Sequence, residues 1–530
     1  MFTFIPFMTR SSQLHSLSRR AAVLALGSLF ASPMIRNRAL AAAEPPSGNY
    51  PFTLGIASGM PRTDSVVLWT RLAPLPHEID GGLPGVQVQV RWELAEDERF
   101  SRGLRTGQVT TRPEHAHSVH VEVAGLPSGA QFFYRFMTRD ATSPIGRTRT
   151  APAQDADVAR LRLALASCQH YEQGAFVAHR DIAARDLDFV LFVGDYIYES
   201  TNPRYRLRAH EGPVPMGLDA YRARHATYKL DPDLRAAHAA HPWVLTWDDH
   251  EVENDYADDH SPKGLGQLAF LQRRAAAYKA YFEHMPVSPA MAPVGPAMRI
   301  HDRYVWGRLA ELWTLDDRQF RSVQACAGGA GPGGRVVAPC DELGDGTRTM
   351  FGMEQERWLA QGLAASTRRW KLLGQGTQMS ASGVDSPLGQ RIHTDGWDGY
   401  PKARDRLLRA IAEPGVNNVL SLGGDVHRHV AAQLRLRPND LASPIVASEF
   451  VCSSITSHGL SEALMGLMRS SNPDMVHARS DERGYALVEI TPQGAHCEFR
   501  GTPFPARDDA RLNTQARFTV ESGRPGVVTG

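Results

Sequence analysis

The sequence has almost no excess of charge of either sign. Its 530 residues include 58 lysines and arginines against 57 aspartates and glutamates, a formal net charge of +1. A surface that binds the phosphate backbone of a nucleic acid needs a clear basic excess. The balance therefore argues against stable nucleic-acid binding, although it leaves room for a small positive pocket.

Long hydrophobic runs are missing after the N-terminus, so no membrane span is expected once that segment is removed. The apolar run 21–30 is itself too short for a permanent anchor. It follows Arg19 and Arg20 and precedes a small-x-small cleavage site at 39–41. Residues 1–43 are therefore predicted to be a twin-arginine-type export signal, with the twin-arginine machinery as a partner during export. A general secretory signal is the alternative, and both predict a periplasmic or secreted protein.

Cysteine is scarce, and the number is odd. The chain has five cysteines, so an exported protein would leave at least one of them unpaired. Cys326 and Cys340 bracket a glycine-rich loop and can form a disulfide. Cys168 directly follows a buried-strand pattern, and it is the cysteine that we expect to be unpaired. It is either an inert buried thiol or a metal ligand.

The hydrophobic pattern changes along the chain. Residues 50–150 contain short alternating runs separated by Gly and Pro, which predicts an N-terminal β-sandwich domain. A small, polar stretch at 151–160 resembles a linker. Beyond it, apolar runs alternate with helical stretches, so residues 160–520 are predicted to form a mixed α/β domain.

Five apolar runs of this second domain end in polar or ligand-type residues. The runs are 161–167, 189–194, 243–247, 370–373 and 419–424, and the residues that follow include Cys168, Asp195, Asp249, Gln375 and Asp425. In open α/β sheets, ligands bind outside the carboxyl ends of the strands. The repetition therefore predicts one site supplied by several strand ends.

The Gly194-Asp195 pair and Tyr198 form the first candidate metal motif. Glycine lets the backbone turn sharply at the strand end, so that one Asp195 carboxylate can bridge two cations. Tyr198 can return to the same metal as a phenolate, a hard ligand that favours an ion such as Fe³⁺. The alternative is an aspartate that caps a helix beside a core tyrosine.

Two further motifs offer ligands. Asp425 and His427 lie on one face of an extended segment and can bind one metal, or they are a turn aspartate and a satisfied histidine. Asp249 and His250 belong to an acidic run that is costly to bury without a compensating cation, unless it is a solvated loop. Asn254 lies close enough to add a hard oxygen ligand, of the kind that Ca²⁺ prefers.

The motifs Cys168, Gly194-Asp195-x-x-Tyr198, Asp249-His250 and Asp425-x-His427 occur in this order, each after an apolar run. This order resembles the calcineurin-like metallophosphoesterases and, within them, the PhoD-type alkaline phosphatases. The runs 52–59 and 66–72 resemble the N-terminal β-sandwich of that family. The resemblance implies a four-layer metallophosphoesterase-type α/β sandwich with an N-terminal fibronectin-III/Ig-like β-sandwich domain.

The resemblance also implies an exported phosphatase and phosphodiesterase that uses Fe³⁺ with Ca²⁺, while Zn²⁺ and Mn²⁺ stay open. The residues implied to bind the iron are Cys168, Asp195, Tyr198 and His427. The candidates for the calcium side, besides the bridging Asp195, are Asp425, Asp249 and Asn254. His170 stands where the wider superfamily has a ligand histidine, so it competes with Tyr198 for the same metal.

The expected reaction is attack on the phosphorus of small phosphoesters by a metal-bound hydroxide. The residues expected to be catalytic are Asp195, His250 and Arg318. His250 would stabilise or protonate the leaving oxygen, and Arg318 would either hold a non-bridging oxygen or form a structural ion pair. A strict phosphodiesterase or phospholipase-type enzyme is an alternative, and a non-catalytic cell-surface metal-binding protein is a more distant one.

Overall fold

The computed structural model describes residues 50–83, 85 and 87–530. The predicted export signal, residues 1–43, lies outside the described residues. Within the described part, every helix is too short or too polar to cross a bilayer.

Two large sheets form the centre of the chain, together with two smaller ones. The ten-stranded sheet has the order β23 (Arg524–Thr529), β22 (Asn513–Glu521), β21 (Gly494–Pro503), β20 (Glu482–Ile490), β8 (Leu161–Ala166), β9 (Phe189–Val193), β10 (Pro242–Thr246), β1 (Ile56–Gly59), β2 (Ser65–Arg71) and β5 (Ser118–Ala124). The seven-stranded sheet has the order β11 (Asp302–Trp306), β12 (Ala310–Thr314), β14 (Trp370–Gly374), β16 (Val419–Gly423), β18 (Ile445–Val451), β17 (His429–Arg435) and β19 (Met475–Arg479). The smaller sheets are β4 (Arg105–Thr111), β3 (Val88–Ala95), β6 (Gln131–Met137) and β7 (Gly146–Arg149), and the pair β13 (Val336–Val337) and β15 (Ile392–His393).

Helices lie in several of the connections between the described strands. The α-helices are α1 (Val177–Ala183), α2 (Leu218–Lys229), α3 (Pro232–Ala240), α4 (Gln267–His284), α5 (Met353–Ala365), α6 (Pro401–Ile411) and α7 (Glu462–Ser471). The short 3₁₀ turns are η1 (Pro113–His115), η2 (Tyr171–Gln173), η3 (Pro203–Tyr205), η4 (Pro289–Met291), η5 (Asp341–Gly344) and η6 (Trp397–Gly399).

The two large sheets pack face to face because their central strands are apolar on both faces. Neighbouring residues of a strand point to opposite sides, so Leu372 of β14 belongs to the core between the sheets and Leu373 to the core beneath the helices. Leu191 of β9 lies in the same inter-sheet core as Leu372. This double burial explains why the strands appear in the sequence as continuous apolar runs.

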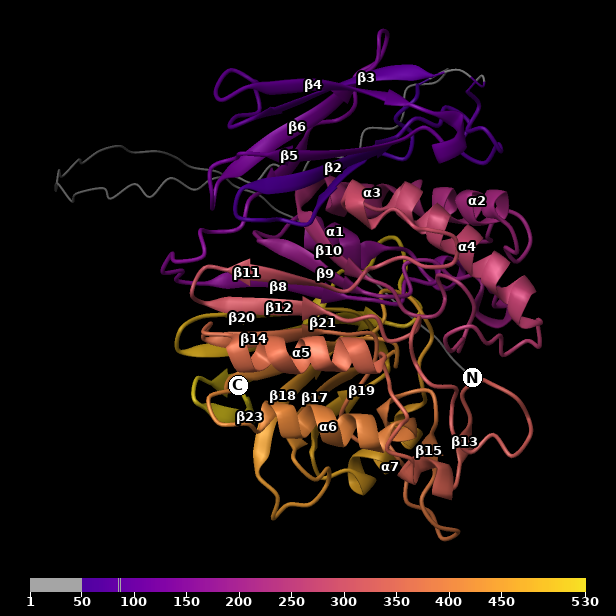
Figure 1. Ribbon diagram of the computed structural model, residues 1–530, viewed down its shortest axis with the longest axis vertical. Coiled ribbons are helices and arrows are strands. Elements are labelled where there is room, and N and C mark those ends of the chain that lie inside the picture. The colour runs from indigo at the N-terminus through magenta and orange to yellow at the C-terminus, as the bar shows by residue number, and fades with distance from the viewer. Residues whose placement is uncertain (1–49, 84, 86) are drawn as a thin grey trace, which may run out of the picture. The chain divides into compact units, whose positions relative to one another are not determined.

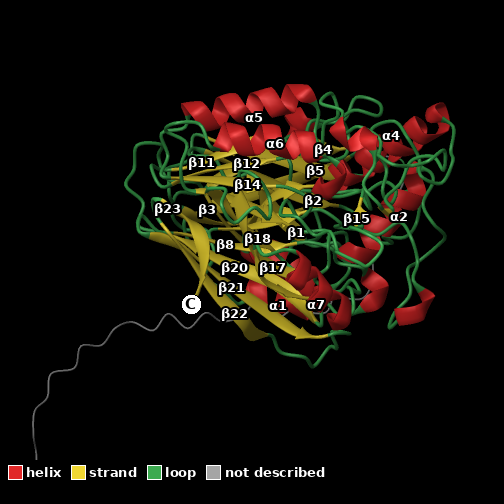
Figure 2. Ribbon diagram, turned by 90° about the horizontal axis from the view of Figure 1, so that it is seen from below, coloured by secondary structure: helices red, strands yellow, loops and turns green. Residues whose placement is uncertain are grey.

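Helices cover the outer face of each sheet. Leu359 of α5 and Leu408 of α6 pack in one cluster with Leu373 of β14. On the other side, His238 of α3 stacks on Trp243 of β10 with ring centroids 3.9 Å apart. Figure 2 shows α5 and α6 on one side of the strands and α1 on the other. The resulting order of helices, sheet, sheet and helices confirms the predicted four-layer α/β sandwich.

The predicted N-terminal β-sandwich is also present. Strands β4, β3 and β6 of the four-stranded sheet lie over β5 and β2 (Figure 1), with Val66, Leu68, Leu94 and Tyr134 in the core between the two sheets. Strand β1 also pairs in parallel with β10, so the inner sheet of the sandwich continues into the ten-stranded sheet. The boundary between residues 150 and 160 stays a prediction.

Truncation of Leu191 tests the inter-sheet core. Its side chain is fully buried, so Leu191→Ala should lower the free energy of unfolding by about 2–5 kcal/mol through lost burial and a new cavity. The matched control is Leu268→Ala, whose side chain is 73 % exposed in α4, and its cost should stay within about 0.5 kcal/mol. Urea denaturation followed by circular dichroism measures both, and equal costs would contradict the assigned packing.

Candidate active site

The carboxyl ends of the central strands of both large sheets meet in one region. Strands β8, β9 and β10 run parallel in the first sheet, and β12, β14, β16 and β18 run parallel in the second. Cys168 and Asp195 follow strands of the first sheet and His427 follows β16 of the second, yet their ligand atoms lie within 4.8 Å of one another. The predicted meeting of strand ends is therefore observed.

Two glycines allow this close approach. Gly194 has a φ of +115°, and a Cβ there would lie 2.5 Å from Cβ of Asp248. A Cβ on Gly424 would lie 2.5 Å from Oγ of Ser167, which directly follows β8 of the other sheet. Since real Cβ atoms do not approach so closely, only glycine fits before Asp195 and before Asp425.

Four predicted ligands have left-handed backbone conformations. The φ angles are 59° for Cys168, 57° for Asp195, 61° for Asp425 and 52° for His427. Non-glycine residues rarely adopt this conformation, which costs on the order of 1–3 kcal/mol and is concentrated at functional sites. No helix begins at Asp195, so the helix-capping alternative for this residue does not hold.

Tyr198 joins the cluster of Cys168, Asp195 and His427. Its hydroxyl donates to Oδ2 of Asp195 at 2.7 Å and lies 3.0 Å from Nε2 of His427. Nδ1 of His427 lies 2.7 Å from the carbonyl oxygen of His458, which orients Nε2 toward the cluster. The structure thus brings together all four side chains that were predicted to bind iron.

Asp195 belongs to two of three neighbouring ligand clusters. A second cluster joins Asp195 to Asp249 and His250, and a third joins Asp249 to Asp255 and Asp395. A carboxylate shared by two adjacent clusters has the arrangement required of a bridging ligand. Asp395 was missed from the sequence because it follows the short strand β15 and not one of the long apolar runs.

Three residues that were predicted or considered as metal ligands have other contacts in the described part of the chain. Oδ2 of Asp425 accepts a hydrogen bond from Oγ1 of Thr377 at 2.6 Å, and the backbone N–H of Asn254 donates to Glu199 at 3.2 Å. The ring of His170 packs against Tyr198 with centroids 4.5 Å apart. Their roles as metal ligands stay predictions, and the contacts of the Tyr198 hydroxyl favour Tyr198 over His170.

The electrostatics of the site fit a cation. Oδ1 of Asp195 is buried and has no hydrogen-bond partner among the described residues. Burial raises the pKa of Asp195 well above its usual value; nearby His250 lowers it in part, and Asp249 and Glu251 raise it further. Such a group is costly to bury in its charged form unless a cation compensates it. The thiol, carboxylate, phenol and imidazole donors together form a set suited to a metal ion.

Arg318 is enclosed by carboxylates. Its guanidinium pairs with Asp248, with Asp395 at 2.8 Å and with Asp249 at 3.6 Å, and its side chain is 1 % exposed. These contacts favour the structural ion pair over contact with a phosphate oxygen, and a catalytic role stays a prediction.

Two supporting glutamates were missed as functional residues. The Glu251 carboxylate accepts from the backbone N–H groups of Asp195 at 3.2 Å, Tyr196 at 2.7 Å and Asp248 at 3.0 Å, so it ties the end of β9 to the end of β10. Burial raises its pKa to about 7. Glu199 contacts Nδ1 of His250. In the sequence, Glu251 belongs to the acidic run and Glu199 directly follows Tyr198. Only the fold shows which groups the two carboxylates contact.

Neighbouring charges also shift the pKa values of His250 and its partner Glu199. Burial alone would lower the pKa of His250, but the carboxylates of Glu199, Asp195 and Asp249 raise it well above its usual value. Burial would raise the pKa of Glu199, but His250 and Lys263 hold it well below its usual range.

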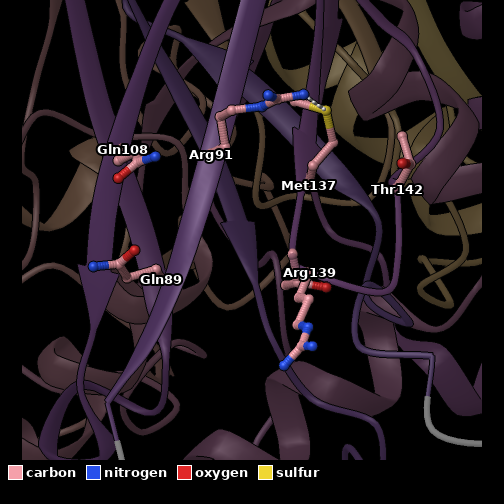
Figure 3. Close-up of a pocket in the computed structure, with 7 residues that line it drawn as sticks. Gln89, Arg91, Gln108, Met137, Arg139 and Thr142 are labelled. Carbon is pink, nitrogen blue, oxygen red and sulfur yellow. Dashed lines mark hydrogen bonds between the residues drawn. The ribbon is translucent and has the colours of Figure 1, made fainter.

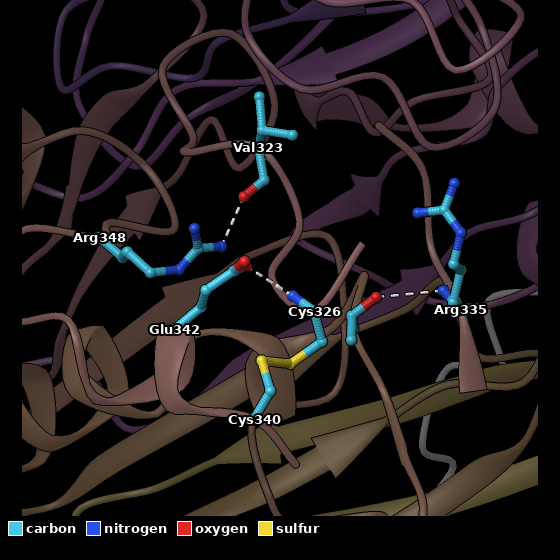
Figure 4. The surroundings of a disulfide bond; sticks show 7 residues. Val323, Cys326, Arg335, Cys340, Glu342 and Arg348 are labelled. Carbon is cyan, nitrogen blue, oxygen red and sulfur yellow. Dashed lines mark hydrogen bonds between the residues drawn. A yellow bond between two sulfur atoms is a disulfide. The ribbon is translucent and has the colours of Figure 1, made fainter. Parts of the chain in front are cut away.

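The predicted disulfide between Cys326 and Cys340 is present (Figure 4), and Cys168 is a free, buried cysteine, as are Cys452 and Cys497. The disulfide closes the glycine-rich loop, and the backbone N–H of Gly334 in this loop donates to Oδ2 of Asp255 at 3.0 Å. The loop therefore covers the third cluster.

A separate cavity of about 500 Å³ lies on the N-terminal sandwich (Figure 3). Its polar lining includes Gln89 and Arg91 of β3 and Gln108 of β4. None of the predicted site residues lines it, so it is distinct from the candidate active site.

A four-layer α/β sandwich with ligand clusters at its strand ends is the architecture of a metallophosphoesterase-type hydrolase. A family model described as PhoD-like phosphatase matches residues 163–499, and one described as its N-terminal domain matches residues 38–152. The chain therefore belongs to the PhoD-like phosphatase family, and it is a phosphoester hydrolase.

Known proteins resemble the chain over nearly its whole length. Alkaline phosphatase D of Bacillus subtilis (strain 168) is 42 % identical over 493 residues, which cover 92 % of this chain and 83 % of that protein. A solved structure described as "Structure of PhoD" has a TM-score of 0.87 and 40 % identity, covering 92 % of this chain and 93 % of that one.

Replacement of Arg318 tests its structural role. Arg318→Gln should lower the free energy of unfolding by about 3–5 kcal/mol, because it leaves buried carboxylates without their partner. The control is Arg308→Gln, which removes an ion pair with Asp157 that is exposed on both sides and should not shift the urea midpoint. An Arg318→Gln protein of unchanged stability but strongly raised KM would instead assign Arg318 to substrate binding.

Proposed function

We propose that the chain is an exported, metal-dependent alkaline phosphatase that also hydrolyses phosphodiesters. The observation that carries the proposal is the Asp195 carboxylate, which is shared by two ligand clusters and has one buried oxygen without a hydrogen-bond partner in the described part of the chain. Membership of the PhoD-like phosphatase family supports phosphatase activity. The two clusters that share Asp195 supply groups that can hold the metals on which this activity would depend.

Fe³⁺ would be held by Cys168, Asp195, Tyr198 and His427. The phenol of Tyr198 supports this choice because a hard phenolate oxygen matches a hard trivalent ion. Ca²⁺ would be held on the acidic side, where Asp249 lies in two clusters and carboxylate oxygens are its preferred ligands. Zn²⁺ and Mn²⁺ remain alternatives that elemental analysis separates.

Cations bound there would lower the pKa of coordinated water and withdraw charge from a phosphoryl oxygen. The protein supplies the rest of the chemistry. Asp195 keeps the ligand clusters together, and Glu251 fixes its backbone. His250 is 12 % exposed and lies beside Asp195 and Asp249, so it can donate a proton to the leaving oxygen.

The substrates would be small phosphoesters, both monoesters and diesters, since one ligand set serves both reactions. The predicted twin-arginine signal supports export to the periplasm or the exterior. This route carries folded proteins, which suits an enzyme that acquires its metals before export. The cysteine pair joined by a disulfide supports an oxidising destination.

Asp195→Asn tests the function. Loss of a supporting residue around a metal ligand already costs about 10–100-fold, so loss of the shared ligand should lower kcat/KM by about 100-fold or more on p-nitrophenyl phosphate and its bis-ester. Bound metal should fall in parallel, as measured by elemental analysis. Near wild-type turnover with full metal content would end the proposal. Asp181→Asn, at a partly buried aspartate outside the three clusters, is the matched control.

Tyr198→Phe tests the iron assignment without an activity assay. A tyrosinate bound to Fe³⁺ gives a visible charge-transfer band, so the wild-type protein should be coloured and the variant should lose the band. The control Tyr304→Phe, a buried tyrosine of β11, should keep it. A coloured Tyr198→Phe protein, or a colourless wild-type protein that contains iron, would contradict the assignment.

A further inference from the structure

We propose that Lys229 is a pH-sensitive element of the fold. The folded protein holds its side chain as the free amine, so that the packing around it becomes more stable as the pH rises. The residue belongs to a buried basic cluster, which lies outside the three ligand clusters and consists of Arg71 of β2, His225 and Lys229 of α2, His238 of α3 and His284 of α4. Figure 1 shows α2 and α3 beside the sandwich strand β2. The inference does not depend on the proposed function.

Lysine is rare in this chain. Five of the 58 basic residues are lysines, and the others are arginines. Lys229 is 1 % exposed. Arginine holds its proton far more firmly than lysine, which can release its proton when it is buried. A lysine at this position therefore permits a neutral side chain where an arginine would impose a charge.

An ammonium group at Lys229 would have no carboxylate partner in the described part of the chain. Asp231, two residues further on, pairs with Arg208 at 2.7 Å. Glu283 of α4 pairs with Arg222 at 2.7 Å. Both nearby acids are therefore bound to arginines. A buried charge without a partner is costly, so the surroundings of Lys229 favour its neutral form.

The hydrogen-bonding environment of Lys229 also favours the free amine. An ammonium group has three N–H donors and no acceptor. Among the described residues, Nζ of Lys229 has one hydrogen-bond neighbour, Nε2 of His238 at 3.2 Å. The hydroxyl of Tyr196 approaches the same nitrogen at 2.7 Å. The free amine fits this environment better, because it has one donor fewer and can accept a hydrogen bond from Nε2–H of His238.

Two aromatic rings lie against the amine. Nζ of Lys229 is 4.4 Å from the centroid of the Trp69 ring and 5.3 Å from that of the Tyr196 ring. A ring face attracts an ammonium group, but it replaces only part of the hydration that burial removes. Burial accordingly lowers the pKa of Lys229 well below its usual value.

The groups that face Lys229 keep their own protonation states between pH 7 and pH 9. Burial lowers the pKa of His225, His238 and His284 well below its usual value, so these rings are neutral in that range. Burial raises the pKa of Tyr196 well above its usual value, so the phenol keeps its proton. Burial lowers the pKa of Arg71 to about 10, so its guanidinium remains charged up to pH 9.

The basic cluster connects the N-terminal sandwich to the end of β9. Trp69 belongs to β2, and its Nε1–H donates to the carbonyl oxygen of Glu283 in α4 at 3.1 Å. Tyr196 directly follows Asp195 and contacts His238 of α3 through its hydroxyl. Protonation of the amine between these rings would therefore weaken the packing of β2, α2 and α3 against the segment that follows β9.

The sign of the pH dependence follows from the number of bound protons. In the unfolded chain a lysine keeps its proton up to a pH of about 10.4. Between the lowered pKa of the folded state and that value, the unfolded chain binds one proton more than the folded protein. The equilibrium constant of unfolding should therefore fall about tenfold for each pH unit through Lys229 alone. This gain in stability is present at high pH and is lost as the pH falls.

Lys229→Met tests the inference, because methionine fills a similar space and cannot bind a proton. Urea denaturation at several values between pH 7 and pH 9 gives the unfolding constants of the variant and the wild type. The ratio of variant to wild type should rise about tenfold for each pH unit, since only the wild type gains stability through this residue. The matched control is Lys402→Met, at an exposed lysine of α6, and its ratio should stay constant.

Nuclear magnetic resonance of the full-length protein labelled with [ε-¹³C]lysine measures the protonation state directly. The five lysines give five signals, and the Lys229 signal is the one that is absent from Lys229→Met. If that variant fails to fold, single variants of the other four lysines assign the signal by elimination. At pH 9 the Lys229 signal should have the chemical shift of a free amine. An ammonium shift for Lys229 at pH 9, or a pH-independent ratio for Lys229→Met, would overturn the inference.

Discussion

The structure depends on a concentration of buried negative charge where two sheets meet. Asp195, Asp249, Asp255 and Asp395 form a continuous row of carboxylates, and burial raises the pKa of Asp195. Two unit charges roughly 4 Å apart interact by about 4 kcal/mol at an effective dielectric constant of about 20. A stable fold therefore needs positive charge at this point. Arg318 and His250 supply part of it, and metal ions would supply the rest.

The surrounding elements are arranged to hold this charge in place. Arg318 joins three carboxylates from two loops, and Glu251 accepts backbone hydrogen bonds from the ends of two strands. The disulfide-closed loop brings the Gly334 N–H to Asp255. Because Arg318, Glu251 and the Gly334 N–H already bind other groups of the site, they have few hydrogen bonds left to offer a substrate. The partly exposed His250 is the group best placed for the reaction itself.

Sequence patterns were sufficient to locate a feature where that feature depends on residues close together in the chain. A buried strand is an uninterrupted apolar run, so its end, and the ligand that follows it, could be located for Cys168, Asp195 and Asp425. The glycine-rich loop between Cys326 and Cys340 similarly indicated the disulfide. Glu199 and Asp395 were missed because neither stands at the end of a long apolar run. Their roles arise from contacts with residues 51 and 77 positions away in the chain, His250 and Arg318.

The sequence by itself determined the class of fold, the order of the ligand motifs and the glycine turn before Asp195, because these follow from local periodicity and backbone sterics. Only the tertiary structure decided that Asp195 is shared by two ligand clusters. It also showed that the Tyr198 hydroxyl, and not the His170 ring, contacts Asp195 and His427 of the first cluster. Arg318 was found to form ion pairs with three carboxylates. The tertiary structure also joined β1 to β10, making the inner sheet of the sandwich continuous with the catalytic sheet. The physical reason is that distances between side chains at different strand ends depend on strand order and sheet packing, which local patterns do not encode.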